Sequence, residues 1–478
     1  MGFTISNFTI SDVSDDPALG RTEAALIGVF AVIAIYFLVY PVWRSQFLIE
    51  IWLTEGWNAY FQDAAASGAN IYPSSVDLIV NNYPPLSFYI IGLLGSIFGD
   101  NLFVGRAVSL VGLVLVSVEI FLCVRTLVGG VFGPAIGALW YAAIMSHNFT
   151  SYVGANDPQL AGEAIMGAGL AWLLARDKAG KSALPALMIM VVGGFWKHSM
   201  VAIPLTAVAW LFIRHGTKAW RPVSLSAAAA AAGLAFCGAI FGKDFFENLL
   251  VARDYSLDHV LGNVGHLQWS ALALVIWACW AISTRTTAAK FTALHVPIAF
   301  LSCILQWLGD KVFGNAEFDL ILALGIAVGV ACESVQSTPL AAYVGSSRAR
   351  TIMVSLLALR LVVTDRQEPA LVLFSSKFRS TIQAGEQSVL KEAGQVTALN
   401  GQVYCTNKLV CRLAGKSFIV DDFKVEQMVA TRIVTQPQLD EILALRKIVT
   451  FKSDLAGRGI VDTSLSQALM HVGTGWQF

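Results

Sequence analysis

Charged residues are scarce in this sequence. Asp, Glu, Lys and Arg make up 13% of its 478 residues and hydrophobic residues make up 56%, whereas soluble domains carry about 25% charged residues. This composition excludes an ordinary soluble protein and predicts an integral membrane protein. The 32 basic and 32 acidic residues cancel, so the chain has no net charge. It lacks the basic excess of a nucleic-acid-binding protein, and we expect no nucleic-acid partner.

Other common signals are missing as well. The opening MGFTISNFTISDVSDDPALGRTE has neither the basic start nor the short apolar core of a cleaved signal peptide, so we expect the first apolar run to persist as a transmembrane helix. The seven cysteines do not show zinc-ligand spacing. Cys405 and Cys411 lie in a polar region and would form a disulfide only if that region is extracytoplasmic. The sequence leaves this pairing open.

Long runs with little or no charge recur along the first three quarters of the chain. Because a full crossing needs about 20 residues, they predict a polytopic, mainly α protein of about eleven transmembrane helices, some of which extend into polar flanks. The runs lie at 24–43, 107–124, 126–149, 158–175, 182–196, 199–213, 222–242, 267–284, 291–309, 318–334 and 351–364.

Basic residues set the expected orientation, because cytoplasmic loops of membrane proteins are rich in Lys and Arg. Basic clusters fall in alternate loops, as in ARDKAGK (175–181) and IRHGTKAWR (213–221). If these loops are cytoplasmic, the N-terminus is cytoplasmic and the segment after 365 is outside. The assignment requires that the 16-residue stretch 84–99 is a short helix on the membrane face. Residues 44–106 are then expected to form one folded outer loop.

Residues 366–478 differ from the rest of the chain. Short apolar runs alternate there with charged segments, and TQPQLDEILALRKI (435–448) has helical spacing. We expect two domains, a transmembrane domain over residues 1–365 and a small soluble α/β domain over residues 366–478 on the outer side. The short apolar runs are ALVLF (370–374), QVYC (402–405), SFIV (417–420) and KIVTF (447–451).

Carboxylates in the outer loops are candidates for acid–base chemistry. Glu55 lies among Trp52, Trp57, Tyr60 and Phe61. Such an apolar, aromatic setting suits a sugar and raises the pKa of a carboxyl group toward the range of a general base. The structural alternative is an ordinary solvated carboxylate.

Two further carboxylates are candidates for catalysis. Glu50 lies five residues before Glu55. Asp157 precedes Pro158, which is typical of a helix N-terminus. Its structural alternative is therefore a helix cap worth about 1 kcal/mol. As a functional group, Asp157 supplies a second carboxylate at the same membrane face as Glu55.

Isolated basic residues in the outer loops are candidates for binding a phosphate group at the membrane surface, because Lys and Arg make charge-assisted hydrogen bonds to it. The structural alternative is that these long side chains reach from helix ends to the membrane surface. The predicted phosphate-binding residues are Lys197, His198, Arg253, Lys311 and Arg106. Trp57, Tyr60, Asn82, Tyr83, Asn315 and Glu317 are expected to line the same cavity.

The order of these motifs resembles the GT-C superfamily of membrane glycosyltransferases, which includes protein O-mannosyltransferases and the lipid A aminoarabinose transferase. The resemblance is carried by EGWNAY, NNYPPL, GDNLFVGRAVSL, NDPQL and GNAEF and covers residue 24 to about 335. It implies a polyprenyl-phosphate sugar donor and transfer on the periplasmic face of a bacterial inner membrane. It also places the base on Glu55 and matches Asp157 to an acidic position after the third span.

One position departs from the pattern of that superfamily. Many of its members carry an Asp-Glu pair in the first loop, whereas Thr54 precedes Glu55 in this chain. The identity of the base therefore stays open between Glu55 and Glu50. The sequence carries no strong metal signature, so we expect no certain cofactor, and the use of a divalent metal ion is left open.

The resemblance and the site residues together predict an inverting glycosyltransferase. Glu55 would deprotonate the hydroxyl of an envelope lipid, glycan or protein acceptor, and cations would stabilise the polyprenyl-phosphate leaving group. Membrane lipids would surround the chain. One alternative is a lipid-linked sugar transporter or flippase, although the sequence has no internal repeat. A non-catalytic assembly protein with a GT-C fold is the other.

Overall fold

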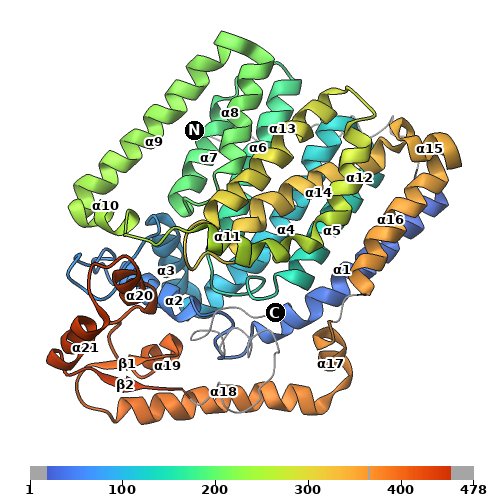
Figure 1. The fold of residues 1–478 in the computed structure, drawn as a ribbon. Helices are drawn as coiled ribbons and strands as arrows, with labels where there is room; N and C mark the ends of the chain where they lie inside the picture. The colour runs from blue at the N-terminus through green and yellow to red at the C-terminus, as the bar shows by residue number, and fades with distance from the viewer. Residues whose placement is uncertain (1–18, 364–365, 454–478) are drawn as a thin grey trace.

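A computed structural model describes residues 19–363 and 366–453, and these residues are mainly helical (Figure 1). The two ends of the chain lie outside the described residues. They are residues 1–18, where no signal peptide is expected, and residues 454–478 of the predicted C-terminal domain. Each predicted apolar run coincides with a helix. These helices are α1 (Arg21–Arg44), α4 (Asn101–Val128), α5 (Phe132–Asn148), α6 (Gln159–Lys178), α7 (Leu184–Trp196), α8 (Ala202–His215), α9 (Trp220–Phe241), α12 (Ala271–Ala281), α13 (Thr287–Gln306), α14 (Phe318–Glu333) and α16 (Ser346–Val362).

Fewer helices are long and apolar enough to cross a membrane than the number of predicted apolar runs. Among the described residues, five helical stretches are long and apolar enough to cross a membrane. A sixth is added if the stretches Leu257–Trp269 and Ala271–Ala281, bent by 73°, count as one span. The five are Arg21–Arg44, Asn101–Val128, Ala202–Phe241, Thr287–Gln306 and Gly314–Glu333. The chain is thus a multi-pass membrane protein, but eleven crossings are not confirmed, because helices such as α7 are only 13 residues long.

Helix α14 forms the centre of the bundle. Its span is 94% buried, and it packs closely against α5. Small residues permit this approach: a Cβ atom on Gly137 of α5 would lie 2.5 Å from the carbonyl oxygen of Gly325. Gly133 faces Gly329 in the same way. Helices in membranes often associate through such small residues, since burying apolar surface gains little in lipid.

The first outer loop holds two short helices, α2 (Glu55–Ala66) and α3 (Leu86–Phe98). Helix α3 begins directly after Pro84 and Pro85 and ends at Gly99. The stretch 84–99 is therefore a short helix, as the sequence predicts. The next helix, α4, begins where the Asp100 carboxylate accepts a hydrogen bond from the Leu102 amide at 2.8 Å. The loop returns to the bundle at that point.

Short elements connect the bundle helices. They include the 3-10 turns η2 (Gly216–Ala219), η3 (Val264–Trp269), η4 (Gly314–Glu317) and η5 (Val335–Ser337). Three short α-helices, α10 (Lys243–Leu249), α11 (Leu257–Asn263) and α15 (Pro339–Val344), complete the connections.

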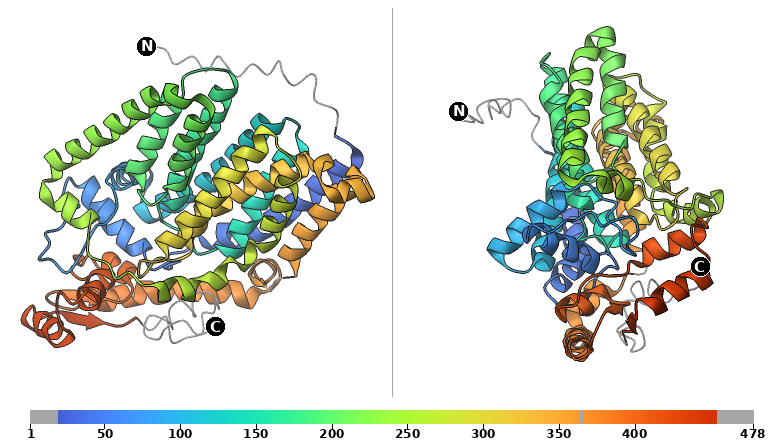
Figure 2. Two further views of the ribbon diagram at one scale, coloured as in Figure 1. Left: turned by 45° about the horizontal axis from the view of Figure 1, so that its top comes forward. Right: turned by 90° about the vertical axis from the view of Figure 1, so that its left-hand side faces the viewer.

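The C-terminal segment lies across one end of the bundle (Figures 1 and 2). It contains α17 (Glu368–Phe374), the long α18 (Ser376–Thr397), α19 (Lys408–Leu413), α20 (Asp422–Ala430) and α21 (Gln436–Leu445). Strands β1 (Val403–Cys405) and β2 (Val449–Phe451) pair in parallel. A disulfide joins Cys405 to Cys411, whose Cα atoms are 5.7 Å apart.

The predictions for this segment are partly confirmed. Helix α21 lies inside the predicted 435–448, and the runs 402–405 and 447–451 each contain a strand. Two runs differ: 370–374 belongs to helix α17, which starts at Glu368–Pro369, and 417–420 has no regular structure. The domain boundary at 365/366 stays a prediction, since residues 364–365 lie outside the described part.

Candidate active site

A cavity of about 1120 Å³ lies between the first outer loop, the bundle and the C-terminal segment. Most of the predicted site residues line it, although they come from distant parts of the chain. The lining residues that the sequence predicts are Glu50, Trp57, Asn82, Tyr83, Asp157, Lys197, His198, Arg253, Lys311 and Asn315. Glu55, Arg106, Tyr60 and Glu317 are not among the lining residues.

Glu55 is sealed in a buried ion pair with Arg106. Its side chain is fully buried, and Arg106 donates to both carboxylate oxygens, at 2.8 Å from Nε and 2.7 Å from Nη2. The amides of Ile51 and Asn156 donate to the same oxygens at 2.6 and 2.7 Å. Such a saturated carboxylate has no lone pair directed at a substrate.

Arg106 is equally occupied. Besides Glu55, its guanidinium donates to the carbonyl oxygens of Ser45, Phe47 and Ile49. These three carbonyls belong to the turn that leads to Glu50. The ion pair therefore supports one wall of the cavity from behind. Arg106 fixes the loop before Glu50, and its guanidinium is not directed at the cavity.

Glu50 lies at the cavity wall in a different environment. Its Oε1 atom is buried without a hydrogen-bond partner among the described residues. Burial raises the pKa of Glu50 to about 8, Lys408 lowers it, and Glu55 and Asp422 raise it further. A carboxyl group with a free oxygen and a pKa near neutrality can accept a proton from a bound hydroxyl group.

Asp157, Lys197 and Tyr83 form a cluster that lines the same cavity. The Lys197 ammonium lies 3.4 Å from Asp157 Oδ1 and 3.2 Å from the Tyr83 hydroxyl, over whose ring it also sits. Burial opposes the charge on Lys197, but Asp157 and Tyr83 outweigh it and raise the lysine pKa. Asp157 also accepts from the Gln159 amide at 2.8 Å, so the expected helix cap and the ion pair are both present.

Three further basic residues line the cavity, namely His198, Arg253 and Lys311. Burial within the protein lowers the pKa of His198 to about 4, and Lys197 and Arg253 add to the effect, so this side chain is neutral at pH 7 although it is open to the cavity. Arg253 packs over the Phe423 ring at 4.9 Å. Lys311 pairs with Glu426 at 2.9 Å.

The C-terminal segment supplies a wall that the sequence did not predict. Lys408 is buried and donates to Asp422 at 2.7 Å, and Asp421 accepts from the Trp57 indole at 2.9 Å. Burial raises the pKa of Asp421 to about 6. No local sequence pattern links these residues to the first outer loop. The two cysteines near Lys408, Cys405 and Cys411, were the one sequence signal that this turn has a fixed structure.

The remaining predicted residues support the cavity from outside or at its edge. The Tyr60 hydroxyl donates to the Lys416 carbonyl at 2.8 Å, and buried Glu317 accepts from the Trp269 indole. Asn315 lies at the edge, where its Oδ1 accepts from the Tyr152 hydroxyl at 3.3 Å. Among the described residues, no group of three His, Cys, Asp or Glu side chains is placed to hold a metal ion.

Comparisons with known proteins agree with the expected resemblance to the GT-C superfamily. Residues 82–241 match the family described as dolichyl-phosphate-mannose-protein mannosyltransferase, which is about a third of the chain. No curated protein matches the chain in sequence.

Solved structures give the fold. ArnT from Cupriavidus metallidurans bound to undecaprenyl phosphate matches with a TM-score of 0.58 and 14% identity, over 88% of this chain and 91% of ArnT. Its apo state matches with the same TM-score and identity, over 93% and 95%. An oligosaccharyltransferase from Archaeoglobus fulgidus reaches only 0.46 at 10% identity, over 84% of this chain and 64% of its own, which is too distant to support an argument. The chain therefore has the fold of ArnT.

Proposed function

We propose that this chain is an inverting glycosyltransferase that takes a sugar from a polyprenyl-phosphate donor. The acceptor is the hydroxyl group of an envelope lipid, glycan or protein. The observation that carries the proposal is the cavity itself, which is lined by Lys197 and by Glu50. The Lys197 ammonium is buried, and the buried Oε1 atom of Glu50 has no hydrogen-bond partner among the described residues. The ArnT fold supports it, since that protein binds undecaprenyl phosphate.

Lys197 is the proposed anchor for the donor phosphate. Its ammonium has three N–H groups, and the described contacts use two of them, to Asp157 and Tyr83. The third is left for a phosphate oxygen. Arg253 and Lys311 supply further positive charge on the same cavity, and His198 donates a hydrogen bond without adding charge.

Glu50 is the proposed general base in preference to Glu55. Glu55 accepts four hydrogen bonds and does not line the cavity, whereas Glu50 lines it and has a buried Oε1 atom without a hydrogen-bond partner among the described residues. Glu50 takes the proton from the acceptor hydroxyl as its oxygen attacks the anomeric carbon. The bond from that carbon to the phosphate oxygen breaks, and the phosphate leaves as an anion that Lys197 stabilises. Attack opposite the leaving group inverts the configuration.

The lipid tail of the donor has an apolar path from the cavity. Val201 and Leu205 of the α8 region and Leu305 of α13 line the cavity and expose their side chains. The Cys405–Cys411 disulfide supports an oxidising compartment for the cavity mouth. We therefore propose a bacterial inner-membrane protein with its N-terminus in the cytoplasm and its C-terminal segment in the periplasm.

Binding of undecaprenyl phosphate to the purified full-length protein tests the proposal. We expect Lys197→Met to weaken binding about tenfold or more, because a charge-assisted hydrogen bond contributes about 1.5–3 kcal/mol. Lys377→Met, on the exposed surface of α18, is the control and is expected to bind as the wild type does. Native mass spectrometry measures both. A wild-type protein that fails to bind this lipid, or a Lys197→Met variant that binds it equally well, would contradict the proposal.

A further inference from the structure

We propose that Lys408 is a positioning residue for Glu50. The disulfide-closed turn of residues 405–411 brings Lys408 to the wall of the cavity that Glu50 also lines. The catalytic part of this inference rests on the proposed function, because Glu50 is the proposed base. The placement of the two groups does not depend on that function.

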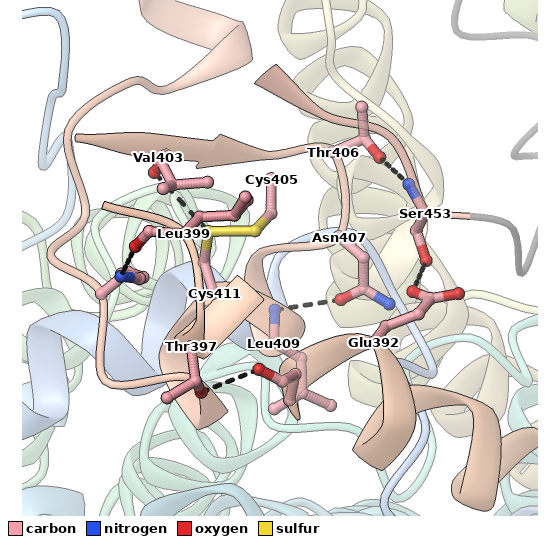
Figure 3. The surroundings of a disulfide bond; sticks show 12 residues. Glu392, Thr397, Leu399, Val403, Cys405, Thr406, Asn407, Leu409, Cys411 and Ser453 are labelled. Carbon is pink, nitrogen blue, oxygen red and sulfur yellow. Dashed lines mark hydrogen bonds between the residues drawn. A yellow bond between two sulfur atoms is a disulfide. The ribbon is translucent and has the colours of Figure 1, made fainter. Parts of the chain in front are cut away.

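The turn that carries Lys408 is held at both ends. The disulfide joins Cys405, the last residue of β1, to Cys411 within α19 (Figure 3). Between them, the Asn407 side chain accepts from the Leu409 amide at 3.0 Å and caps α19. The Lys408 backbone is thus fixed, so its side chain has a defined direction.

The same turn is docked directly on the first outer loop. A Cβ atom on Gly56 would lie 2.7 Å from both the Leu409 amide nitrogen and the Lys408 Cβ atom. Only glycine allows the C-terminal segment to approach this closely. Gly56 follows Glu55 and lies six residues after Glu50, so the docking brings Lys408 to the loop that carries the proposed base.

The charges around Glu50 explain why one lysine matters. The positive charge of Lys408 lowers the pKa of Glu50. Burial, Glu55 and Asp422 raise this pKa and so favour the neutral acid. The Gly56 amide also favours the charged form. Lys408 itself is kept charged by Asp422 and Asp421, despite its burial, and Glu50 adds to this.

With a pKa of about 8, Glu50 is already largely protonated at pH 7, and loss of Lys408 would lower its charged fraction further. A protonated carboxyl group cannot accept a proton from an acceptor hydroxyl. Lys408 thus acts through Glu50 without contact to the reacting atoms. It ties the C-terminal segment to the chemistry of the first outer loop.

Labelling with dicyclohexylcarbodiimide tests this inference without a substrate. The reagent adds to a protonated carboxyl group, and the adduct is located by peptide mass spectrometry. Labelling of Glu50 in the detergent-solubilised, full-length protein is expected to fall as pH rises. In Lys408→Gln the midpoint should move upward by about one pH unit or more, the usual effect of losing a nearby opposite charge.

Two further variants separate charge from structural damage. Lys408→Arg keeps the charge and should retain the wild-type midpoint. Asp422→Asn removes an acidic neighbour of Glu50 and the partner of Lys408, so its midpoint should move downward. Damage to the fold would move the midpoints of Lys408→Gln and Asp422→Asn in the same direction.

Lys452 provides the matched control, because it is a lysine that lines the same cavity, whereas Lys408 is the lysine that lowers the pKa of Glu50. Lys452→Gln should keep the wild-type midpoint. An unchanged midpoint in Lys408→Gln, an equal shift in Lys452→Gln, or no labelling of wild-type Glu50 would overturn the inference. Loss of lipid binding would refute the proposed function alone, since labelling requires no lipid.

Discussion

Glu50 and Glu55 are five residues apart and have opposite environments. Arg106 and two backbone amides satisfy Glu55, whereas Glu50 lines the cavity and its buried Oε1 atom has no hydrogen-bond partner among the described residues. A carboxylate that is fully paired holds structure, and one that is partly unpaired is available for chemistry. We therefore assign the two residues different roles.

The first prediction concerns the pH dependence of stability at these two positions. The pKa of Glu50 is raised from 4.5 to about 8 in the folded protein, mainly by burial. Its contribution to stability is therefore complete below pH 4.5 and is lost as pH rises through 8. Glu50→Gln does not ionise, so its Tm relative to wild type should increase between pH 5 and pH 9. Thermal unfolding in detergent measures this.

Glu55→Gln provides the contrast. It leaves the Arg106 charge buried without its partner, which costs about 3–5 kcal/mol. Its Tm should fall at every pH in that range. A Glu50→Gln variant that loses stability to the same extent, with no dependence on pH, would show that the two carboxylates do not differ in this way.

The aromatic neighbours of Glu55 predicted the region of the site but not the base. Trp57 does line the cavity. Arg106, however, lies 51 residues after Glu55, and Asn156 lies 101 residues after it. Which of two nearby carboxylates is neutralised depends on these distant partners, and one sequence does not reveal them.

At the scale of elements, the apolar runs predicted the helices, whereas the predicted number of crossings is not confirmed. Charge-free runs mark helices because membrane segments satisfy their backbone hydrogen bonds internally. A run of 13 residues, such as α7, still forms a helix, although it is shorter than a full crossing. In the C-terminal segment, Pro369 at the start of α17 is the sequence signal that the apolar run 370–374 belongs to a helix.

The second prediction concerns the crossing of α5 and α14. Gly137→Ala places a methyl group about 2.5 Å from the Gly325 carbonyl oxygen, so the two helices must separate. We expect a loss of about 1–3 kcal/mol, the usual cost of overpacking, seen as a lower Tm in detergent.

Gly194→Ala in α7 is the matched control. A Cβ atom on Gly194 meets nothing within 4 Å. Its Tm should be unchanged or slightly higher, since alanine favours a helix over glycine. Equal Tm values for the two variants would mean that the close approach of α5 and α14 contributes nothing to stability.

At the scale of the whole molecule, the first outer loop contacts the C-terminal segment. Trp57 bonds to Asp421 across 364 residues, and Arg412 binds Asp63 and Asp100 of the first outer loop region. The sequence predicted much of the bundle side of the cavity, because its motifs have a familiar order. It did not predict the wall formed by Lys408 and Asp421, because contacts this distant leave no local pattern.

The third prediction concerns this docking. Arg412→Glu replaces the attraction to Asp63 and Asp100 with repulsion, and we expect the C-terminal segment to open about tenfold or more often, which corresponds to about 1.4 kcal/mol. Limited trypsin digestion in detergent should cleave faster at Lys416.

Lys391→Glu makes the same charge change on the exposed surface of α18. Its rate of cleavage at Lys416 should match that of the wild type. If Arg412→Glu is also cleaved at the wild-type rate, the ion pairs with Asp63 and Asp100 do not hold the segment in place.

The contact between Lys408–Leu409 and Gly56 has a consequence for the newly made protein. A ribosome finishes residues 44–57 long before it reaches 404–423, and proteins are built from the N-terminus. The wall of the cavity that Lys408 and Asp421 form is therefore added only after residues 404–423 have been made. A chain that stops before these residues has an incomplete cavity.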